Sequence, residues 1–144
     1  SVIKQKKIEI KNGIHKFATY KKFKIKVEKS KKKLIKIFKN LKVKNKTVIG
    51  YGATAKAVTV LNYCKIDHNY INYFLDTTPE KQNKYMPGVK IYVKKYVKLK
   101  TNNIDYVFLG AWNFKKEIFS KEKNFLDQKG KFITHVPFPK IISS

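Results

Sequence analysis

A strand, a glycine turn and a helix follow one another between Thr47 and Cys64, in the sequence TVIGYGATAKAVTVLNYC. Gly50 and Gly52 permit a tight turn, because a residue without a Cβ lets the backbone bend sharply and approach a ligand closely. The following helix would direct its free N–H groups and the positive end of its dipole towards a group bound above the turn. This pattern fits a phosphate or nucleotide site in an α/β sheet. It also fits a purely structural turn, because the third glycine of the dinucleotide fingerprint is missing.

Segments of strand and helix type alternate along the rest of the chain. We expect strands at 47–49, 71–75, 89–93, 105–110 and 131–136, and helices at 53–64 and 114–128. The apolar runs of the strands are continuous, which indicates a sheet whose two faces are both covered. The sequence therefore predicts the α/β class, with a Rossmann-like, mostly parallel open sheet, helices on both faces, and residues 131–136 as its closing strand.

The first 45 residues form a lysine-rich segment ahead of this core. Residues 3–13 read as extended, with a turn at Asn12–Gly13, and a long helix is expected from about Lys16 to Lys42. Its apolar face follows a spacing of three and four residues and comprises Tyr20, Phe23, Val27, Ser30, Leu34, Ile37 and Leu41. We expect this face to pack on the domain or on a neighbour rather than on a membrane surface. The chain is interpreted as a single domain, 1–144, with a helical segment at 1–45 and a core at 46–144.

The net charge of +25 comes entirely from lysine, because the chain contains no arginine. Such a charge attracts polyanions, but proteins that read bases rely on the bidentate arginine fork. We interpret the lysines as a solvated surface, of the kind that codon bias in an AT-rich genome produces, and do not expect a nucleic-acid partner. No apolar run is long enough to span a membrane, and no signal-peptide pattern is present. A lone cysteine, Cys64, excludes an internal disulfide and fits a cytoplasmic location.

Four segments should meet at the carboxyl edge of the sheet, where open α/β sheets bind ligands: 50–56, 76–88, 110–114 and 135–138. Asp76 lies 24 residues after Gly52, near the spacing at which an acidic residue contacts a ribose. Lys56, Lys81 and Lys84 could each contact a phosphate. The alternative is that Asp76 caps the turn that follows it and that these lysines are only solvated.

Aromatic and polar side chains in the same segments leave further alternatives open. Tyr51 either stacks on a base or sugar, or packs on a neighbouring loop. Asn113 is expected to cap the helix that begins near Phe114, while Trp112 would fill an interface. His135, at the end of the last strand, is a candidate general base. The three histidines and single cysteine are scattered, so no metal site is predicted.

Several motifs of the chain, taken in order, resemble one known family. They are Gly50–Lys56, Leu61–Cys64, Asp76 with Pro79, Lys81–Gln82, Lys84–Tyr85 and Pro87–Gly88, then Ala111–Phe114, Glu117–Ile118, Gly130–Ile133 and Val136–Pro137. This series resembles the C-terminal domain of the S-adenosylmethionine-dependent sugar C-methyltransferases, which methylate nucleotide-linked deoxysugars. The resemblance covers nearly the whole chain.

The resemblance implies a segment that binds a nucleotide sugar and carries no catalytic residue and no cofactor of its own. In that family S-adenosylmethionine and the catalytic residues belong to a separate methyl-donor domain, which would act with this segment in cis or in trans. The expected substrate-binding residues are Gly50, Tyr51, Gly52, Ala53, Lys56, Asp76, Lys81, Lys84, Trp112 and Asn113. Two alternatives remain: an independent module for NAD, coenzyme A or another nucleotide, and, favoured only by charge, a basic nucleic-acid-binding protein.

Overall fold

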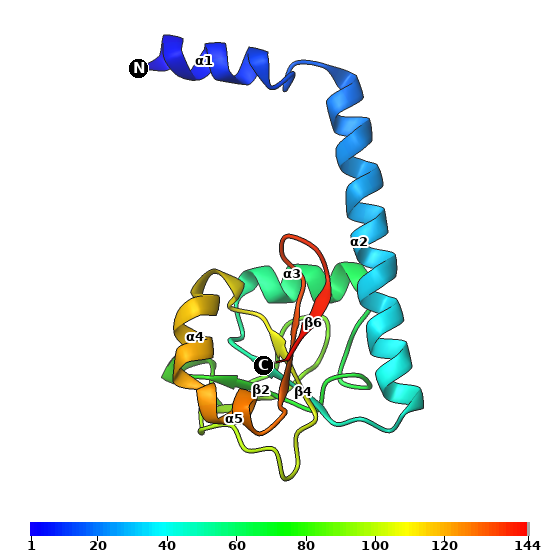
Figure 1. Ribbon diagram of the computed structural model, residues 1–144, viewed down its shortest axis with the longest axis vertical. Coiled ribbons are helices and arrows are strands. Elements are labelled where there is room, and N and C mark those ends of the chain that lie inside the picture. Colours follow the sequence, from blue (N-terminus) through cyan, green and yellow to red (C-terminus); the bar gives the residue numbers. More distant parts are fainter. Residues whose placement is uncertain (144) are drawn as a thin grey trace.

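Six strands form one sheet in the computed structural model, which describes residues 1–143 (Figure 1). The strands are β1 (Val48–Tyr51), β2 (Phe74–Asp76), β3 (Val93–Lys95), β4 (Tyr106–Leu109), β5 (Lys131–Thr134) and β6 (Lys140–Ile142). Their spatial order is β3-β2-β1-β4-β5-β6, and every neighbouring pair is parallel except β5 and β6. The predicted mostly parallel, open α/β sheet is therefore confirmed.

Alternate residues of the central strands enter two separate hydrophobic cores, one on each face of the sheet. Phe74 and Phe108 point into the core covered by α2 (Phe17–Val43) and α3 (Ala55–Cys64). Their chain neighbours Leu75 and Val107 point into the core covered by α4 (Lys115–Lys121) and α5 (Lys123–Asp127). Both faces of the strands are buried, which explains why their sequences are apolar without alternation.

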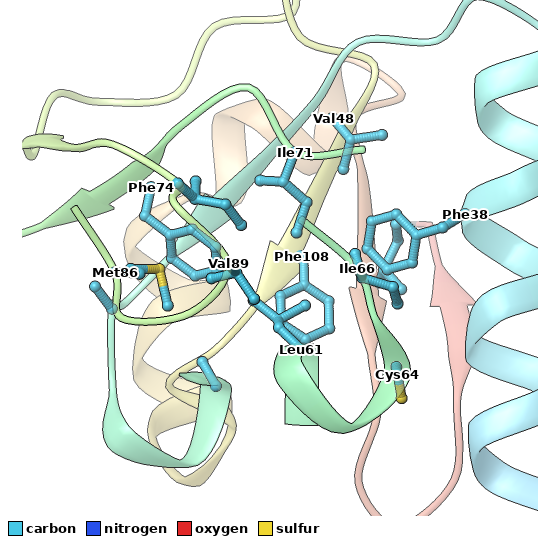
Figure 2. Packing of buried hydrophobic residues seen from close by; sticks show 14 of the residues in the cluster. Phe38, Val48, Leu61, Cys64, Ile66, Ile71, Phe74, Met86, Val89 and Phe108 are labelled. Atoms are coloured by element: carbon cyan, nitrogen blue, oxygen red, sulfur yellow. The ribbon is translucent and has the colours of Figure 1, made fainter. Parts of the chain in front are cut away.

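The core beneath α2 and α3 is built around aromatic rings (Figure 2). Phe38 of α2 reaches the sheet and meets the ring of Phe108 at a centroid distance of 5.8 Å. Phe108 in turn meets Phe74 edge-on at 6.2 Å. Leu61 and Cys64 of α3 line the same core, so the helix after the glycine turn is fixed on the sheet by its apolar face.

The order of the strands creates a crevice at the centre of the sheet. From β1 the chain runs through α3 to β2 and then β3 on one side, whereas β4, α4, α5 and β5 lie on the other side. The reversal of direction falls between β1 and β4, and a crevice outside the carboxyl ends of the strands forms at such a switch point. The residues that follow β1, β2 and β4 therefore lie at this crevice.

The N-terminal segment differs in part from its prediction. The helix expected at 16–42 is present as α2, but residues 3–13 are not extended: Val2–Lys11 form helix α1, which ends at the Asn12–Gly13 turn. A strand there would have no neighbouring strand for its backbone groups, whereas lysine, glutamine and glutamate favour helix, and Gln5 donates a hydrogen bond to Glu9 one turn later. Both α1 and the first half of α2 extend away from the sheet (Figure 1).

Four other elements have boundaries that differ from their prediction. The strand expected at 71–75 begins only at Phe74 and forms β2. The strand expected at 89–93 begins only at Val93, because the preceding residues form turns and an isolated bridge between Tyr85 and Tyr92. The helix expected at 114–128 is interrupted at Glu122, whose buried side chain is held by neighbouring segments. The strand at 131–136 ends at Thr134 and does not close the sheet, since β6 returns antiparallel beside it.

Candidate ligand-binding pocket

A pocket of about 310 Å³ lies at the carboxyl ends of β1 and β2, next to the segment that follows β4. Its size is at the lower end of the range typical of small-molecule sites. It is lined by Tyr51, Gly52, Thr54, Leu75, Asp76, Thr77, Thr78, Lys81, Tyr96, Ala111, Phe114, Glu117, Ile118 and Lys121. The crevice that the strand order predicts is therefore present, with aromatic, hydroxyl and charged groups in its wall.

The turn between β1 and α3 forms one side of the pocket and requires glycine for two reasons. Gly52 has a φ of +80°, and a Cβ at this position would lie 2.5 Å from that of Ala111. Its N–H donates to the carbonyl of Leu75 at 2.8 Å, which ties the turn to β2. The backbone after β1 is thus pressed against the segment after β4, and no side chain separates them.

Thr54 begins α3 at the edge of the same pocket. Its Oγ1 accepts a hydrogen bond from the Ala57 N–H at 3.1 Å and donates one to the carbonyl of Gly110 at 3.1 Å. The first bond is an N-cap, which satisfies one of the free N–H groups of the first turn. The second bond joins the start of α3 to the end of β4, so the first turn of the helix has a fixed orientation relative to the pocket.

Asp76 closes β2 and binds the glycine turn directly. One carboxylate oxygen accepts from the Ala53 N–H at 2.7 Å and lies 3.4 Å from the Lys81 ammonium, and the other accepts from the Thr78 N–H at 2.8 Å. Burial by itself would raise the pKa of Asp76, but the hydrogen bonds from Thr78 and Ala53 and the charge of Lys81 lower it below its ordinary value. Asp76 is therefore ionised and connects the glycine turn after β1 to the loop after β2. It does cap the turn at Thr78.

Two tyrosines form an aromatic wall above a buried carboxylate. The rings of Tyr51 and Tyr96 meet edge-on at 5.6 Å, and their hydroxyls both donate to Glu122 Oε1, at 3.5 Å and 2.6 Å. The other oxygen, Oε2, accepts from the Leu99 N–H at 3.1 Å. Burial, reinforced by the bond to Glu122, raises the pKa of Tyr96 to about 12, and burial also raises that of Tyr51. Both tyrosines are therefore neutral at physiological pH.

Four of the ten residues expected at the site line this pocket: Tyr51, Gly52, Asp76 and Lys81. Ala53 supports the pocket through its N–H bond to Asp76. Gly50 lies below the turn, where a Cβ would be 2.3 Å from the ring of Phe74, so its role is close packing. Tyr51 is buried against Tyr96, as in the packing alternative.

The other four expected residues lie outside the pocket lining. The Lys56 ammonium lies over the Trp112 ring, 5.9 Å from its centroid, and Lys84 is exposed on the loop. Asn113 makes no capping hydrogen bond: it lies within a short 3₁₀ turn, η2 (Trp112–Phe114), and Phe114 is the N-cap of α4. The predicted capping role of Asn113 is therefore wrong.

Lys121, Glu117 and Tyr96 line the pocket but were not predicted. The sequence does contain a signal for Lys121 and Glu117, because Phe114, Glu117, Ile118 and Lys121 recur at the spacing of one helix face. In the structure this face points to the carboxyl edge of the sheet. Tyr96 lies in the irregular segment after β3, and no pattern in the sequence marks it. Thr78 also lines the pocket, and the sequence marks its position only as the turn that follows Asp76.

His135, in the fourth segment expected at this edge, lies on the opposite face of the sheet from the tyrosines. Its ring stacks on that of Phe108 at 5.3 Å, and its buried Nδ1 has no hydrogen-bond partner in the described part of the chain. Burial lowers its pKa to about 4. His135 does not line the pocket, so this arrangement gives it no contact with a ligand bound there.

Two kinds of feature are absent from residues 1–143. No group of three or more histidine, cysteine, aspartate or glutamate side chains in this range is arranged to hold a metal ion. None of the helices described combines the length and the apolar character needed to cross a bilayer.

Comparison with known proteins identifies the family. Residues 1–137 match the family described as the C-methyltransferase C-terminal domain. Over 132 residues the chain is 35% identical to the C-methyltransferase NovU of Streptomyces niveus, an alignment that covers 92% of this chain and 31% of that relative. The chain thus spans about a third of the length of the curated relative that it matches. The match extends over nearly all of the residues that form the sheet and its pocket, and the chain belongs to the family of C-methyltransferase C-terminal domains.

Proposed function

We propose that the pocket binds the nucleotide-sugar substrate of an S-adenosylmethionine-dependent C-methyltransferase that acts on deoxysugars. The observation that carries this proposal is the convergence of a glycine turn, the capped start of α3 and two lysines on one pocket at the switch point of the sheet. A helix N-terminus and lysine side chains are groups with which proteins bind phosphates, whereas the N–H groups of Gly52 and Ala53 are already bonded within the fold. The family match supports the same class of enzyme.

Each part of the pocket has a place in this proposal. Lys81 and Lys121 would neutralise the diphosphate, while Gly52 lets it approach the backbone without a side chain in the way. Tyr51 and Tyr96 would form the wall against which the base or the sugar lies. Thr77, in the wall of the same pocket, adds a hydroxyl group that can bind a phosphate or sugar oxygen. The chain would therefore bind and orient the substrate.

We infer that S-adenosylmethionine is not the ligand of this pocket. Its sulfonium is a cation, and the pocket already contains the ammonium groups of Lys81 and Lys121. Both oxygens of Asp76, the acidic residue nearest the turn, already accept hydrogen bonds from backbone N–H groups. We therefore propose that the methyl donor is bound by a separate domain, in cis or in trans, and that this chain is not catalytic alone. The same engagement of Asp76 disfavours the NAD-binding alternative, in which this carboxylate would bind a ribose.

The proposed setting is the cytoplasm, which is reducing. Cys64, the single cysteine of the chain, is buried in the core beneath α3. A buried thiol of this kind behaves as a small apolar residue, and its burial raises the pKa of Cys64. It has no part in the proposed site.

Thermal shift and calorimetry with dTDP, a dTDP-sugar, NAD and coenzyme A, at moderate salt, test the function. A ligand present at 100 times its Kd stabilises the native state by about 2.7 kcal/mol, which is several degrees for a domain of this size. We expect a shift with the dTDP ligands that Lys81→Gln reduces and that the exposed variant Lys84→Gln does not. A shift only with NAD or coenzyme A would contradict the proposal, as would a response to nucleic acid alone that disappears with salt.

A further inference from the structure

Lys121 is the cation of the pocket whose charge is least compensated. The ammonium of Lys81 lies 3.4 Å from Asp76, so part of its charge is already neutralised. Among residues 1–143 no carboxylate lies within 4.0 Å of the Lys121 ammonium, and this includes Glu117, which lines the same pocket one turn earlier on α4. A positive charge at a pocket wall without an acidic partner favours an anionic ligand.

An aromatic ring determines where this ammonium lies. The Lys121 Nζ is 3.8 Å from the centroid of the Tyr96 ring, over its face. A lysine side chain has many rotamers, and a cation–π contact favours those that place the ammonium over the ring. Tyr96 lines the pocket as well, so the contact holds the ammonium of the exposed Lys121 side chain beside the pocket.

Tyr96 is held in turn by Glu122, the residue that follows Lys121. The Tyr96 hydroxyl donates to Glu122 Oε1 at 2.6 Å, and Glu122 is completely buried at the break between α4 and α5. A buried carboxylate costs several kcal/mol unless donors satisfy it, and here Tyr96, Tyr51 and the Leu99 N–H donate. The arrangement joins the segment after β3 to the helix that carries Lys121.

We propose that Glu122 and Tyr96 are positioning residues that hold the Lys121 ammonium at the pocket as a binding group for a diphosphate. The proposal rests on the proposed function, to which it adds a binding residue and the two side chains that orient it. A diphosphate is the class of anion that suits two lysines of the same pocket beside a glycine turn, because its charge is spread over several oxygens.

Calorimetry with inorganic pyrophosphate and with dTDP tests this arrangement in a double-mutant cycle. Lys121→Gln removes the charge, and Tyr96→Leu removes the ring that orients it. We expect Lys121→Gln to weaken pyrophosphate binding about tenfold and Tyr96→Leu about threefold, and the double variant to bind no more weakly than Lys121→Gln alone. Lys116→Gln, at an exposed position on the same helix, is the matched control and should bind as the wild type does.

Two conservative variants separate positioning from a loss of folding. Tyr96→Phe keeps the ring but loses the bond to Glu122, so it should weaken binding less than Tyr96→Leu. Glu122→Gln retains an acceptor for the Tyr96 hydroxyl and should also have the smaller effect, with thermal unfolding measured on every variant. The positioning roles would be overturned if the losses of binding free energy in the two single variants added up in the double variant. They would also be overturned if Tyr96→Leu bound pyrophosphate as tightly as the wild type does. Binding of pyrophosphate without binding of dTDP or a dTDP-sugar would overturn the proposed function and leave this inference standing, and binding of neither would overturn both.

Discussion

The two halves of α2 have similar sequences but different environments. Each half carries many lysines with apolar residues at intervals of three and four. In the second half Leu34, Phe38 and Leu41 are at most 5% exposed, because they pack on the sheet and α3. In the first half Phe17 and Phe23 are 73% and 65% exposed. A helix of 27 residues is about 40 Å long, which is longer than the surface that the core offers it, so periodicity alone does not determine burial.

Truncating one phenylalanine in each half is the strongest test of this contrast. Phe38→Ala removes a ring that is 1% exposed and in contact with Phe108, and should lower the free energy of unfolding by about 3–5 kcal/mol. Phe23→Ala, on the extended half, should change it by about 0.5 kcal/mol or less. Urea denaturation of both variants measures the difference. Equal losses would mean that the first half of α2 is also covered in solution.

The core beneath α2 should also make stability depend on pH, through His135. Its ring stacks on Phe108, which contacts Phe38, and burial lowers its pKa from 6.5 to about 4. The native pKa of His135 lies below the unfolded value. The contribution of the neutral, buried His135 to the free energy of unfolding is therefore fully present above about pH 6.5 and is lost as the pH falls towards 4. A shift of this size corresponds to about 3 kcal/mol. His135→Phe should flatten the decline between these limits in urea denaturation, and an unchanged slope would contradict this account.

Charged side chains show the same contrast between the α/β core and the N-terminal helices that project from it. Asp76 is 6% exposed and accepts hydrogen bonds from Ala53 and Thr78, whereas Glu9 is exposed and accepts one from Gln5. Asp76→Asn keeps the shape but loses the charge and one acceptor, so it should cost about 2 kcal/mol. Glu9→Gln should have an effect within about 0.5 kcal/mol. Thermal unfolding distinguishes the two, and similar losses would show that Asp76 does not stabilise the glycine turn.

The sequence predicts the sheet well because the signals of its strands are local. Continuous apolar runs such as 105–110 indicate buried strands, and Gly52 marks a turn that the folded backbone does require, whereas Gly50 is needed for close packing on Phe74. Predictions failed where the partner of a segment decides its structure. Residues 3–13 could be strand or helix by composition, and the absence of a neighbouring strand makes them helix.

The sequence predicts which edge of the sheet carries the pocket, but it does not predict every side chain that lines the pocket. The approach of the glycine turn to Asp76 could be anticipated, because both follow strands that end at the same edge of a parallel sheet. Lys56 and Lys84 have the same composition and charge as Lys81, and only the fold shows that Lys81 alone of these three lines the pocket. Tyr96 joins the pocket through a bond to Glu122, 26 residues away, and no pattern within one segment can reveal such a contact.

The smallest effect is expected when α1 is removed altogether. No residue of α1 is buried, and a helix of ten residues is too short to be stable in water on its own. Deleting residues 1–15 should therefore leave the helical signal in circular dichroism nearly unchanged and alter the free energy of unfolding by only about 0.5 kcal/mol or less. The same deletion should leave dTDP binding unchanged, since the pocket is formed entirely by residues from Tyr51 onwards. A large loss of stability would show that α1 contacts the body of the domain in solution, and the contrast between the two halves of α2 would then have to be revised.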